Sequence, residues 1–228
     1  MSIAFQQAVA AWGNIGLSPQ SSGAFTPAAG SWLSDIIFDA SGTGKSLVYS
    51  GSVNTPLSKL SVDDASGGNT VGIAAVNSVT GGSQTLTVST SPTGDGVAGW
   101  GIEYSGVASD GSYSSATPGF TSAPAGSAVT VPAGSVLYAF CVSSSGSGGT
   151  LTPSVNGGVT PSNRGSGTLS TSHVYCHGEW VGTGGSITPT FAASAGNTFT
   201  VIQVILTPAA PAAVYQPIIH NQKYLYFI

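Results

Sequence analysis

The pattern of apolar and polar positions along the chain predicts a succession of short β-strands. Runs in which apolar residues alternate with polar or small ones are separated by turn-forming pairs such as GG, DG and NG. A period of two places the apolar side chains on one face of a strand, and glycine, asparagine and aspartate favour the backbone conformations of turns. The expected strands span residues 46–53, 70–79, 84–90, 96–107, 135–143, 171–181, 187–193 and 198–206.

Alternation also indicates which face of a strand is buried. In the run 171–181, Val174, Cys176 and Trp180 share the face that we expect to pack in a core. The opposite face carries His173, Tyr175, His177 and Glu179. We expect this second face on a solvated surface or at a subunit contact. The run 198–206 is apolar on both faces, which predicts a strand that is central or covered.

Many short strands with turn signals between them are typical of an all-β sandwich or barrel. We therefore expect an antiparallel β-sandwich, jelly-roll-like, with one main domain over residues 1–207. Near the N-terminus, Ile3, Phe5 and Val9 fit the period of a strand, while Phe5, Val9 and Trp12 also fit helical spacing. We expect a strand there.

Residues 208–228 differ in character from the rest of the chain. They contain Pro208, Pro211 and Pro217, and proline this dense cannot continue a central strand. We expect an extended, Pro-rich C-terminal arm. Its apolar end consists of Tyr224, Leu225, Tyr226, Phe227 and Ile228. Leaving a large apolar side chain in water costs about 1.5–3 kcal/mol, so we expect the end to dock on a neighbouring subunit or partner rather than on its own domain.

The charge content narrows the function. Only 4 residues are Lys or Arg and 8 are Asp or Glu, so charged residues make up 5% of the chain and the net charge is −4. Four basic residues cannot neutralise a run of phosphates, which argues against nucleic-acid binding. No apolar run is long enough to span a bilayer as a helix, and no basic amphipathic helix is evident. Membrane association is therefore not expected.

The N-terminal sequence and the composition point in different directions. No Lys or Arg precedes the first apolar residues, so the N-terminus is a poor secretory signal. The uncharged Ser-, Thr- and Gly-rich composition nevertheless suits an external surface. A particle assembled inside a cell and released by lysis would reconcile the two observations, as would a signal peptide removed before this sequence begins.

Two cysteines, Cys141 and Cys176, are too few for a disulfide framework and lack CxxC spacing. We expect two buried free thiols rather than a single bridge. The segment Gly42–Ser46, GTGKS, matches the end of a P-loop, but Asp39 stands where the first glycine belongs. Because Ser46 opens a predicted strand rather than a helix, we expect a tight turn.

Metal binding is not expected either. His177 and Glu179 could share a metal across one strand face, but His173 lies about 13 Å from His177 at roughly 3.3 Å per residue. Asp63, Asp64 and Asn69 could hold Ca²⁺ through oxygen ligands, yet the same residues in VDDASGGNT are ordinary turn formers. We expect no metal and no cofactor.

Catalysis has few candidate residues. A glycosidase needs two carboxylates about 5–10 Å apart across a cleft, and the glutamates are Glu103 and Glu179, both on strand faces predicted to point away from the core. There is no GxSxG motif for a serine nucleophile. An enzyme is therefore not expected. Four tryptophans and eight tyrosines leave carbohydrate stacking open.

Three segments resemble a known module. SVDDASGGNT, then GGSQTLTVST, then GWGIEYSGVAS are similar in pattern to a β-sandwich module of tailed-phage virion proteins, and HVYCHGEWVGTGGSITPTFAASAGNTFTVIQVIL is similar to its closing strands. The likeness covers roughly residues 1–207. It implies a virion structural component of the head decoration, cement, fibre or tail type, and it implies no catalytic residue.

These observations predict a non-enzymatic phage structural protein, a decoration or cement subunit that stabilises the head through inter-subunit contacts. We expect it in the virion, bound to other virion proteins (above all the major capsid protein) and self-associated as a homo-oligomer. The residues expected to dock are those of the apolar end, 224–228, with Ile3, Phe5 and Trp12 as a second contribution. The alternative is a tail-fibre or secreted lectin-like module that binds glycans through exposed Trp and Tyr.

Overall fold

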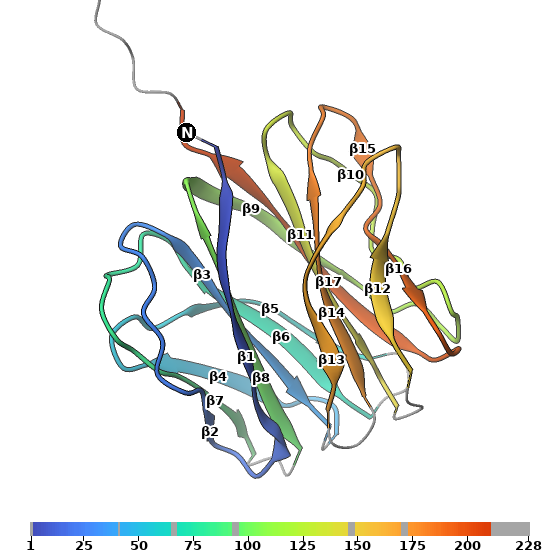
Figure 1. The fold of residues 1–228 in the computed structure, drawn as a ribbon. Helices are drawn as coiled ribbons and strands as arrows, with labels where there is room; N and C mark the ends of the chain where they lie inside the picture. Colours follow the sequence, from blue (N-terminus) through green and yellow to red (C-terminus); the bar gives the residue numbers. More distant parts are fainter. Residues whose placement is uncertain are drawn as a thin grey trace, which may run out of the picture.

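A computed structural model of the chain describes residues 2–40, 42–64, 68–92, 96–145, 149–169 and 173–210. Within these ranges the chain forms strands and turns and no helix, and every strand pair is antiparallel. Two five-stranded sheets pack face to face, and smaller sheets cover their outer faces (Figure 1). The predicted all-β sandwich is confirmed, with additional outer layers that the pattern did not predict.

The first half of the chain forms one five-stranded sheet and one outer sheet. The five-stranded sheet has the order β1 (Ala4–Gly16), β8 (Val97–Ser105), β3 (Trp32–Asp39), β6 (Thr70–Val76) and β5 (Leu57–Asp63). The outer sheet has the order β2 (Gln20–Ser21), β7 (Leu86–Ser91) and β4 (Ser46–Gly51).

The second half repeats this arrangement. Its five-stranded sheet has the order β13 (Ser162–Thr168), β14 (Val174–Val181), β11 (Val136–Ser143), β17 (Phe199–Pro208) and β9 (Val107–Ala116). Its outer layer pairs β10 (Val129–Thr130) with β15 (Ser186–Ile187) and β12 (Leu151–Ser154) with β16 (Thr190–Ala193).

Both halves follow one strand order. We count the strands within each half, from β1 to β8 and from β9 to β17, with β15 and β16 counted as one. In each five-stranded sheet the strands then lie side by side in the order first, eighth, third, sixth and fifth. In each outer layer the seventh strand lies between the second and the fourth, with β15 and β16 together taking the seventh position. A jelly roll distributes eight strands over two sheets as two Greek keys, whereas each half here has five strands in one sheet and the others in the outer layer. The predicted jelly-roll-like arrangement therefore stays a prediction.

The residue register is repeated as well. Leu33 on β3 lies opposite Val76 on β6, and Leu137 at the same place on β11 lies opposite Trp180 on β14. Each fifth strand carries a one-residue irregularity at the corresponding position, which leaves Lys59 on β5 and Arg164 on β13 outside the pairing. We therefore treat residues at matching register positions as equivalent in the two halves.

A single residue, Gly106, joins the two halves between β8 and β9. Its φ of +72° is a conformation that glycine adopts without a steric penalty. A Cβ atom at this position would lie 2.4 Å from the carbonyl oxygen of Ser2. The chain can cross from one sheet to the other here because this residue has no side chain.

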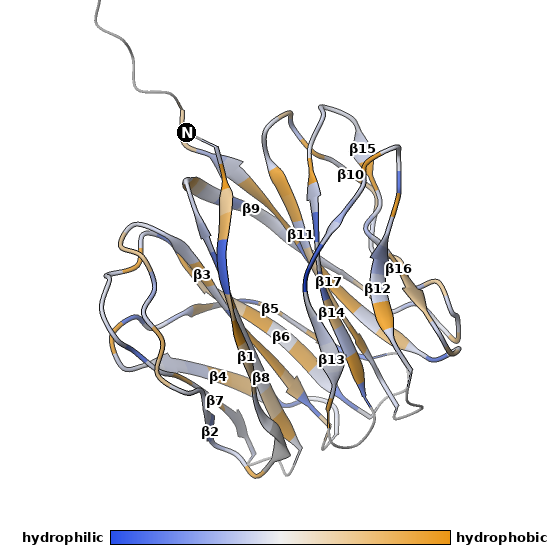
Figure 2. Ribbon diagram, viewed as in Figure 1, coloured by the Kyte–Doolittle hydropathy of each residue, from blue (hydrophilic) through white to orange (hydrophobic). Residues whose placement is uncertain are grey.

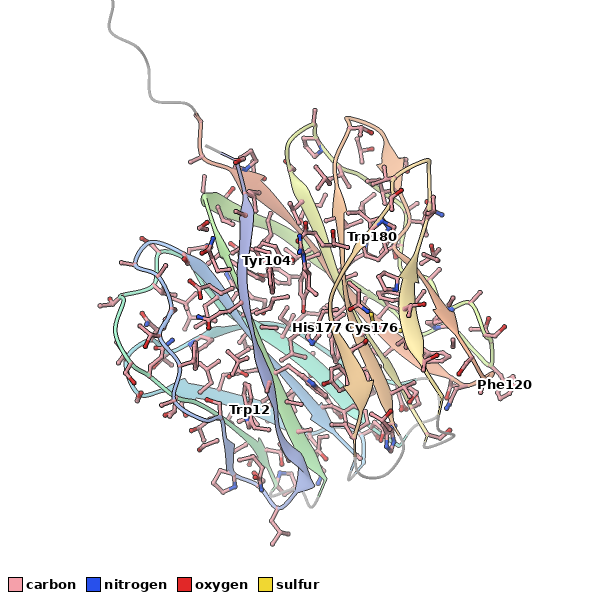
Figure 3. The ribbon with its side chains drawn as sticks, in the orientation of Figure 1. Trp12, Tyr104, Phe120, Cys176, His177 and Trp180 are labelled. Atoms are coloured by element: carbon pink, nitrogen blue, oxygen red, sulfur yellow. The ribbon has the colours of Figure 1, made fainter. Side chains whose placement is uncertain are left out.

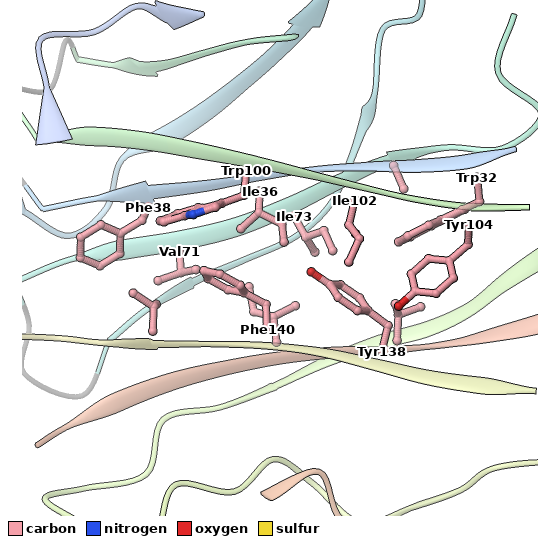
Figure 4. Close-up of a cluster of buried hydrophobic side chains, with 14 of the residues drawn as sticks. Trp32, Ile36, Phe38, Val71, Ile73, Trp100, Ile102, Tyr104, Tyr138 and Phe140 are labelled. Atoms are coloured by element: carbon pink, nitrogen blue, oxygen red, sulfur yellow. The ribbon is translucent and has the colours of Figure 1, made fainter. Parts of the chain in front are cut away.

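The central core lies between the two five-stranded sheets (Figures 2 and 4). Its largest members are Trp32, Phe38, Trp100, Tyr104, Tyr138 and Phe140. The ring centroids of Trp100 and Phe140 are 5.0 Å apart, and those of Trp32 and Tyr138 are 6.2 Å apart. Because each of these pairs joins the two halves, the aromatic contacts hold the sheets together.

Basic side chains at the two irregular positions close the open edges of this core. The Lys59 ammonium lies 3.1 Å from an Asp110 carboxylate oxygen and 5.8 Å from the centroid of the Tyr113 ring on β9. The Arg164 guanidinium lies 4.7 Å from the centroid of the Phe5 ring on β1. Each fifth strand thus contacts an aromatic residue on the first strand of the other half.

Most predicted strands are present with small changes at their ends. The run 198–206 becomes β17, which lies between β11 and β9 with both faces covered, as predicted. The run 187–193 is divided between β15 and β16. Strands β2, β3, β5, β9, β10, β12 and β13 were not predicted.

Candidate functional site: an open strand position beside β12

The strand order leaves a position open in the outer layer of the second half. Among the described residues strand β12 pairs with β16 along one edge only, because β13, the next strand in the chain, pairs with β14 in the five-stranded sheet. Between β12 and β13 lies a groove of about 280 Å³. It is lined by Gly149, Thr150, Leu151, Thr152, Ser166, Gly167 and Thr168.

The lining is small and uncharged. The hydroxyl residues Thr150, Thr152, Ser166 and Thr168 are exposed, whereas Leu151 is buried in the outer core of the second half. Hydroxyl groups can both donate and accept hydrogen bonds. With no ionisable group among its lining residues, the groove can bind a ligand but offers no side chain for general acid–base catalysis.

The equivalent place in the first half has larger side chains. Lys45, Val62 and Asp63 occupy the positions of Gly149, Gly167 and Thr168. One Asp63 carboxylate oxygen accepts hydrogen bonds from the backbone N–H of Gly44, at 3.1 Å, and from the Thr70 hydroxyl, at 2.7 Å. The hydrogen bond from Gly44 links the segment before β4 to the end of β5. In the second half Thr168 replaces Asp63 at this position, so the two halves differ here.

Glu103 and Glu179 lie on the strand faces that alternation assigned to them, but these faces are buried, so the expectation of isolated surface carboxylates was wrong. Glu103 is buried and accepts hydrogen bonds from the Gln7 side chain, at 2.6 Å, and from the backbone N–H of Ala28, at 2.7 Å. Glu179 is also buried and forms two hydrogen bonds with Arg164, at 2.7 and 2.9 Å. The two carboxylates belong to different five-stranded sheets and serve separate structural hydrogen-bond networks.

The predicted solvated face of 171–181 is likewise buried. His177 lies in the central region between the sheets, and its Nδ1 is 2.7 Å from the Tyr138 hydroxyl (Figure 3). His173 is buried with its ring centroid 5.0 Å from that of Phe38. The prediction was wrong because the second five-stranded sheet is covered on both faces. Among the described residues no group of three His, Cys, Asp or Glu is placed to hold a metal.

The turn residues behave as turn chemistry predicted. Asp64 accepts hydrogen bonds from the backbone N–H of Gly68, at 3.1 Å, and from the Asn69 side-chain amide. The Asn69 amide also donates to the carbonyl oxygen of Ser144, at 2.7 Å. Ser46 begins strand β4, so GTGKS precedes a strand and lacks the helix that a P-loop requires.

The cysteines are free and buried, as predicted. Cys141 and Cys176 are direct register partners on β11 and β14, and both contribute to the outer core of the second half. Burial raises the pKa of the Cys176 thiol to about 12. Burial also raises the pKa of the Cys141 thiol, so neither thiol is activated as a nucleophile at neutral pH.

The tryptophans are not available for stacking against sugars. All four are buried, and the most accessible, Trp12, is only 6% exposed. Trp12 packs flat against Gly99, where a Cβ atom would lie 2.4 Å from the indole ring. The lectin-like alternative invoked exposed tryptophans and tyrosines, so it has lost the tryptophans and otherwise stays a prediction.

The predicted docking residues fall into two groups. Ile3 and Phe5 are partly buried against the central core, and Trp12 belongs to the outer core of the first half. Within this chain these three side chains thus have internal packing roles. Tyr224, Leu225, Tyr226, Phe227 and Ile228 lie outside the described residues, so docking through the arm stays a prediction.

Several apolar side chains that the sequence analysis did not single out are exposed. Phe120 is 81% exposed in the loop after β9, and its ring lies over Gly196 (Figure 3). Leu57, Leu17 and Val155 are also exposed. The sequence could have indicated the exposure of Phe120, because this residue follows Gly119 and precedes turn-forming residues, and residues in such loops face solvent.

Asp35 is the one fully buried carboxylate in the described chain for which neither oxygen has a hydrogen-bond partner. It lies on β3, opposite Ala74 and Gly101. Burial raises its pKa well above the usual value. The folded state therefore takes up a proton that the unfolded chain releases above about pH 4, and this group lowers stability as pH rises.

Replacing Asp35 with asparagine is expected to stabilise the protein by about 2 kcal/mol at pH 8, because the carboxyl group must take up a proton to be buried and a neutral amide need not. The gain should shrink toward pH 4, where the carboxyl group of the unfolded chain becomes protonated as well. Urea unfolding of both proteins at pH 4, 6 and 8 measures the difference. A gain that is independent of pH would contradict the assignment.

Comparison with models of known families, with curated protein sequences and with solved structures finds no match to this chain. In the described residues no helix is long and apolar enough to cross a membrane.

Proposed function

We propose that this chain is a non-enzymatic structural protein of a tailed-phage particle, acting as a capsid decoration or cement subunit. The observation that carries the proposal is the placement of the ionisable groups. Glu103, Glu179 and His177 are buried in hydrogen bonds that support the fold. The described surface carries few charged groups, such as Lys59 and Asp63, among hydroxyl groups, isolated apolar side chains and an uncharged groove, which suits contact rather than chemistry.

The proposed mechanism is burial of surface between subunits. Contacts with the major capsid protein and with further copies of this chain would link neighbouring capsomers. A surface with few charges keeps such contacts insensitive to salt, because screening acts on charge pairs. Two further observations support the assignment: the resemblance of residues 1–207 to tailed-phage sandwich modules, and the doubled architecture, which presents two similar sheet systems on one chain.

Deleting residues 211–228 is expected to abolish binding to particles that lack this protein, while thermal unfolding stays unchanged. Strand β17 ends at Pro208, and the backbone N–H of Ala209 still donates to the carbonyl oxygen of Gly106, at 3.1 Å. Co-sedimentation of the full and truncated chains with purified capsids measures occupancy.

A matched control replaces Phe120 with serine, which removes the most exposed apolar side chain of the described region and leaves the arm in place. If the truncated chain decorates capsids at wild-type occupancy, the arm has no docking role. If neither the full chain nor the Phe120→Ser variant binds capsids, the decoration function itself is rejected.

A further inference from the structure

We propose that the groove beside β12 receives part of the C-terminal arm of a second copy of this chain, bound as an added β-strand. The inference rests on the proposed function and names the partner of its contact surface. The groove supplies a free strand edge, and the sequence supplies a segment suited to it.

The first step of the argument is the free edge of β12. The outer layer of the second half has its second, seventh and fourth strands, and the place beside the fourth strand is open. Strand β12 has four residues, and one of them, Pro153, has no N–H to donate. An extended segment there would hydrogen-bond to the remaining N–H and carbonyl groups of the free edge, as in other cases of strand addition to a sheet edge. Neighbouring strands lie about 4.8 Å apart, so the added strand would lie over the small side chains of β13.

The second step concerns side-chain size and charge. Gly149, Gly167 and four hydroxyl residues line the groove, with Leu151 beneath them. Such a lining leaves room for large side chains from the ligand and contains no charge that would lose its hydration. The first half lacks this room, because Lys45, Val62 and Asp63 take the equivalent positions. We therefore place the site in the second half alone.

The third step is the choice of ligand. Residues 218–228 of the arm contain no proline, and they include the isoleucines Ile218 and Ile219 and the apolar end, 224–228. Every residue of the segment can donate a backbone hydrogen bond, and tyrosine, phenylalanine and isoleucine favour strands. Lys223 is its one formally charged residue. The low charge of the segment suits a groove whose lining is uncharged.

The fourth step is the choice of a second copy over the same chain. Strand β17 ends at Pro208, beside Gly106 and the start of β1 (Figure 1). The groove lies at the other end of the sheet, near Val174 and Phe199. These two places are roughly 30 Å apart along β17. Strand β17 runs toward Pro208, away from the groove. At about 3.3 Å per residue the stretch from Pro208 to Ile218 spans at most about 33 Å, so the segment could reach the groove of its own chain only by reversing direction and running straight back along the sheet.

The test uses two variants that each remove one partner of the contact. Thr152→Trp fills the groove at an exposed position of β12, and deletion of residues 218–228 removes the proposed strand. Val48→Trp is the matched control, because Val48 is the exposed equivalent of Thr152 on β4 in the first half. Sedimentation velocity of the purified chains measures self-association.

We expect wild type and Val48→Trp to self-associate with similar affinity. Thr152→Trp and the deletion variant should each associate at least tenfold more weakly. Mixed together, they should form a complex, because the first retains the arm and the second retains the open groove. Thr168→Trp repeats the test from the β13 side if Thr152→Trp does not fold.

Equal association of wild type and Thr152→Trp, or no complex in the mixture, would overturn the inference. Loss of the groove contact without any loss of capsid binding leaves the decoration function in place. Failure of capsid binding by a chain that self-associates through the groove rejects the decoration function alone. The two proposals can therefore fail separately.

Discussion

Replacing Arg164 with alanine is expected to lower the free energy of unfolding by about 3 kcal/mol. The Arg164 guanidinium forms hydrogen bonds of 2.7 and 2.9 Å to both carboxylate oxygens of Glu179, whose side chain is buried. Removing one partner of such a pair leaves a buried charge without compensation, which costs more than the pair itself contributes. Urea unfolding at pH 7 measures the loss.

The matched control is Lys59→Ala at the equivalent position of the first half. Its partner Asp110 keeps hydrogen bonds from the Tyr113 hydroxyl, at 2.6 Å, and from the Asn77 amide, at 2.7 Å. Partial burial raises the pKa of Asp110, but the hydrogen bonds from these two residues and from Lys59 outweigh it and bring the pKa to about 2. We expect a loss of about 1 kcal/mol, because the Asp110 carboxylate is as buried as that of Glu179 but keeps these two hydrogen bonds when the ammonium is removed. Equal losses in the two variants would refute this account.

Acidification is expected to destabilise the protein through His177. Burial lowers the pKa of His177 from its ordinary 6.5 to about 3. The folded state keeps this ring neutral while the unfolded chain takes up a proton below pH 6.5, so the contribution of His177 to stability is lost as pH falls toward 3. At about 1.4 kcal/mol per unit of pKa, the loss amounts to roughly 5 kcal/mol.

The variant His177→Ile tests this expectation, because Ile73 occupies the equivalent position in the first half. It loses the contact with the Tyr138 hydroxyl and should be less stable than wild type at pH 7.5. Its unfolding free energy should fall less steeply between pH 6.5 and 4.5. Parallel pH profiles for the two proteins would show that His177 titrates alike in both states. Because burial also lowers the pKa of His173, the unfolding free energy of the variant should still fall with falling pH, but less steeply.

Alternation was enough to predict most strands but not the environment of their polar faces. A period of two separates the two faces of β14 correctly, and Val174, Cys176 and Trp180 are buried as expected. It cannot show that the opposite face is covered as well. The residues that satisfy His177 and Glu179 are Tyr138 and Arg164, which come from other strands. These contacts depend on which strands are neighbours, and the alternation of residues within one strand does not show that.

The internal repeat was missed for a similar reason. The two halves share one strand order and one register, yet their sequences match visibly only in short segments, such as GGSQTLTVS at 81–89 and GGSITPTFA at 184–192. Equivalent core positions carry different residues, as at Ile73 and His177, because a core constrains volume and polarity more than identity. The groove beside β12 depends on which strand β13 pairs with, so it could not be predicted before the topology was known.

The shared central core has a consequence for how this chain is made. During synthesis the first half can form its own hydrogen bonds, but one face of its five-stranded sheet, which carries Trp32, Trp100 and Tyr104, has no cover until β11 and β17 have been translated. Pairings this distant in sequence form slowly, and an uncovered aromatic sheet is prone to aggregation. Although the architecture is doubled, a ribosome that stops after residue 106 would release an incomplete fold, and the two halves behave as one indivisible unit.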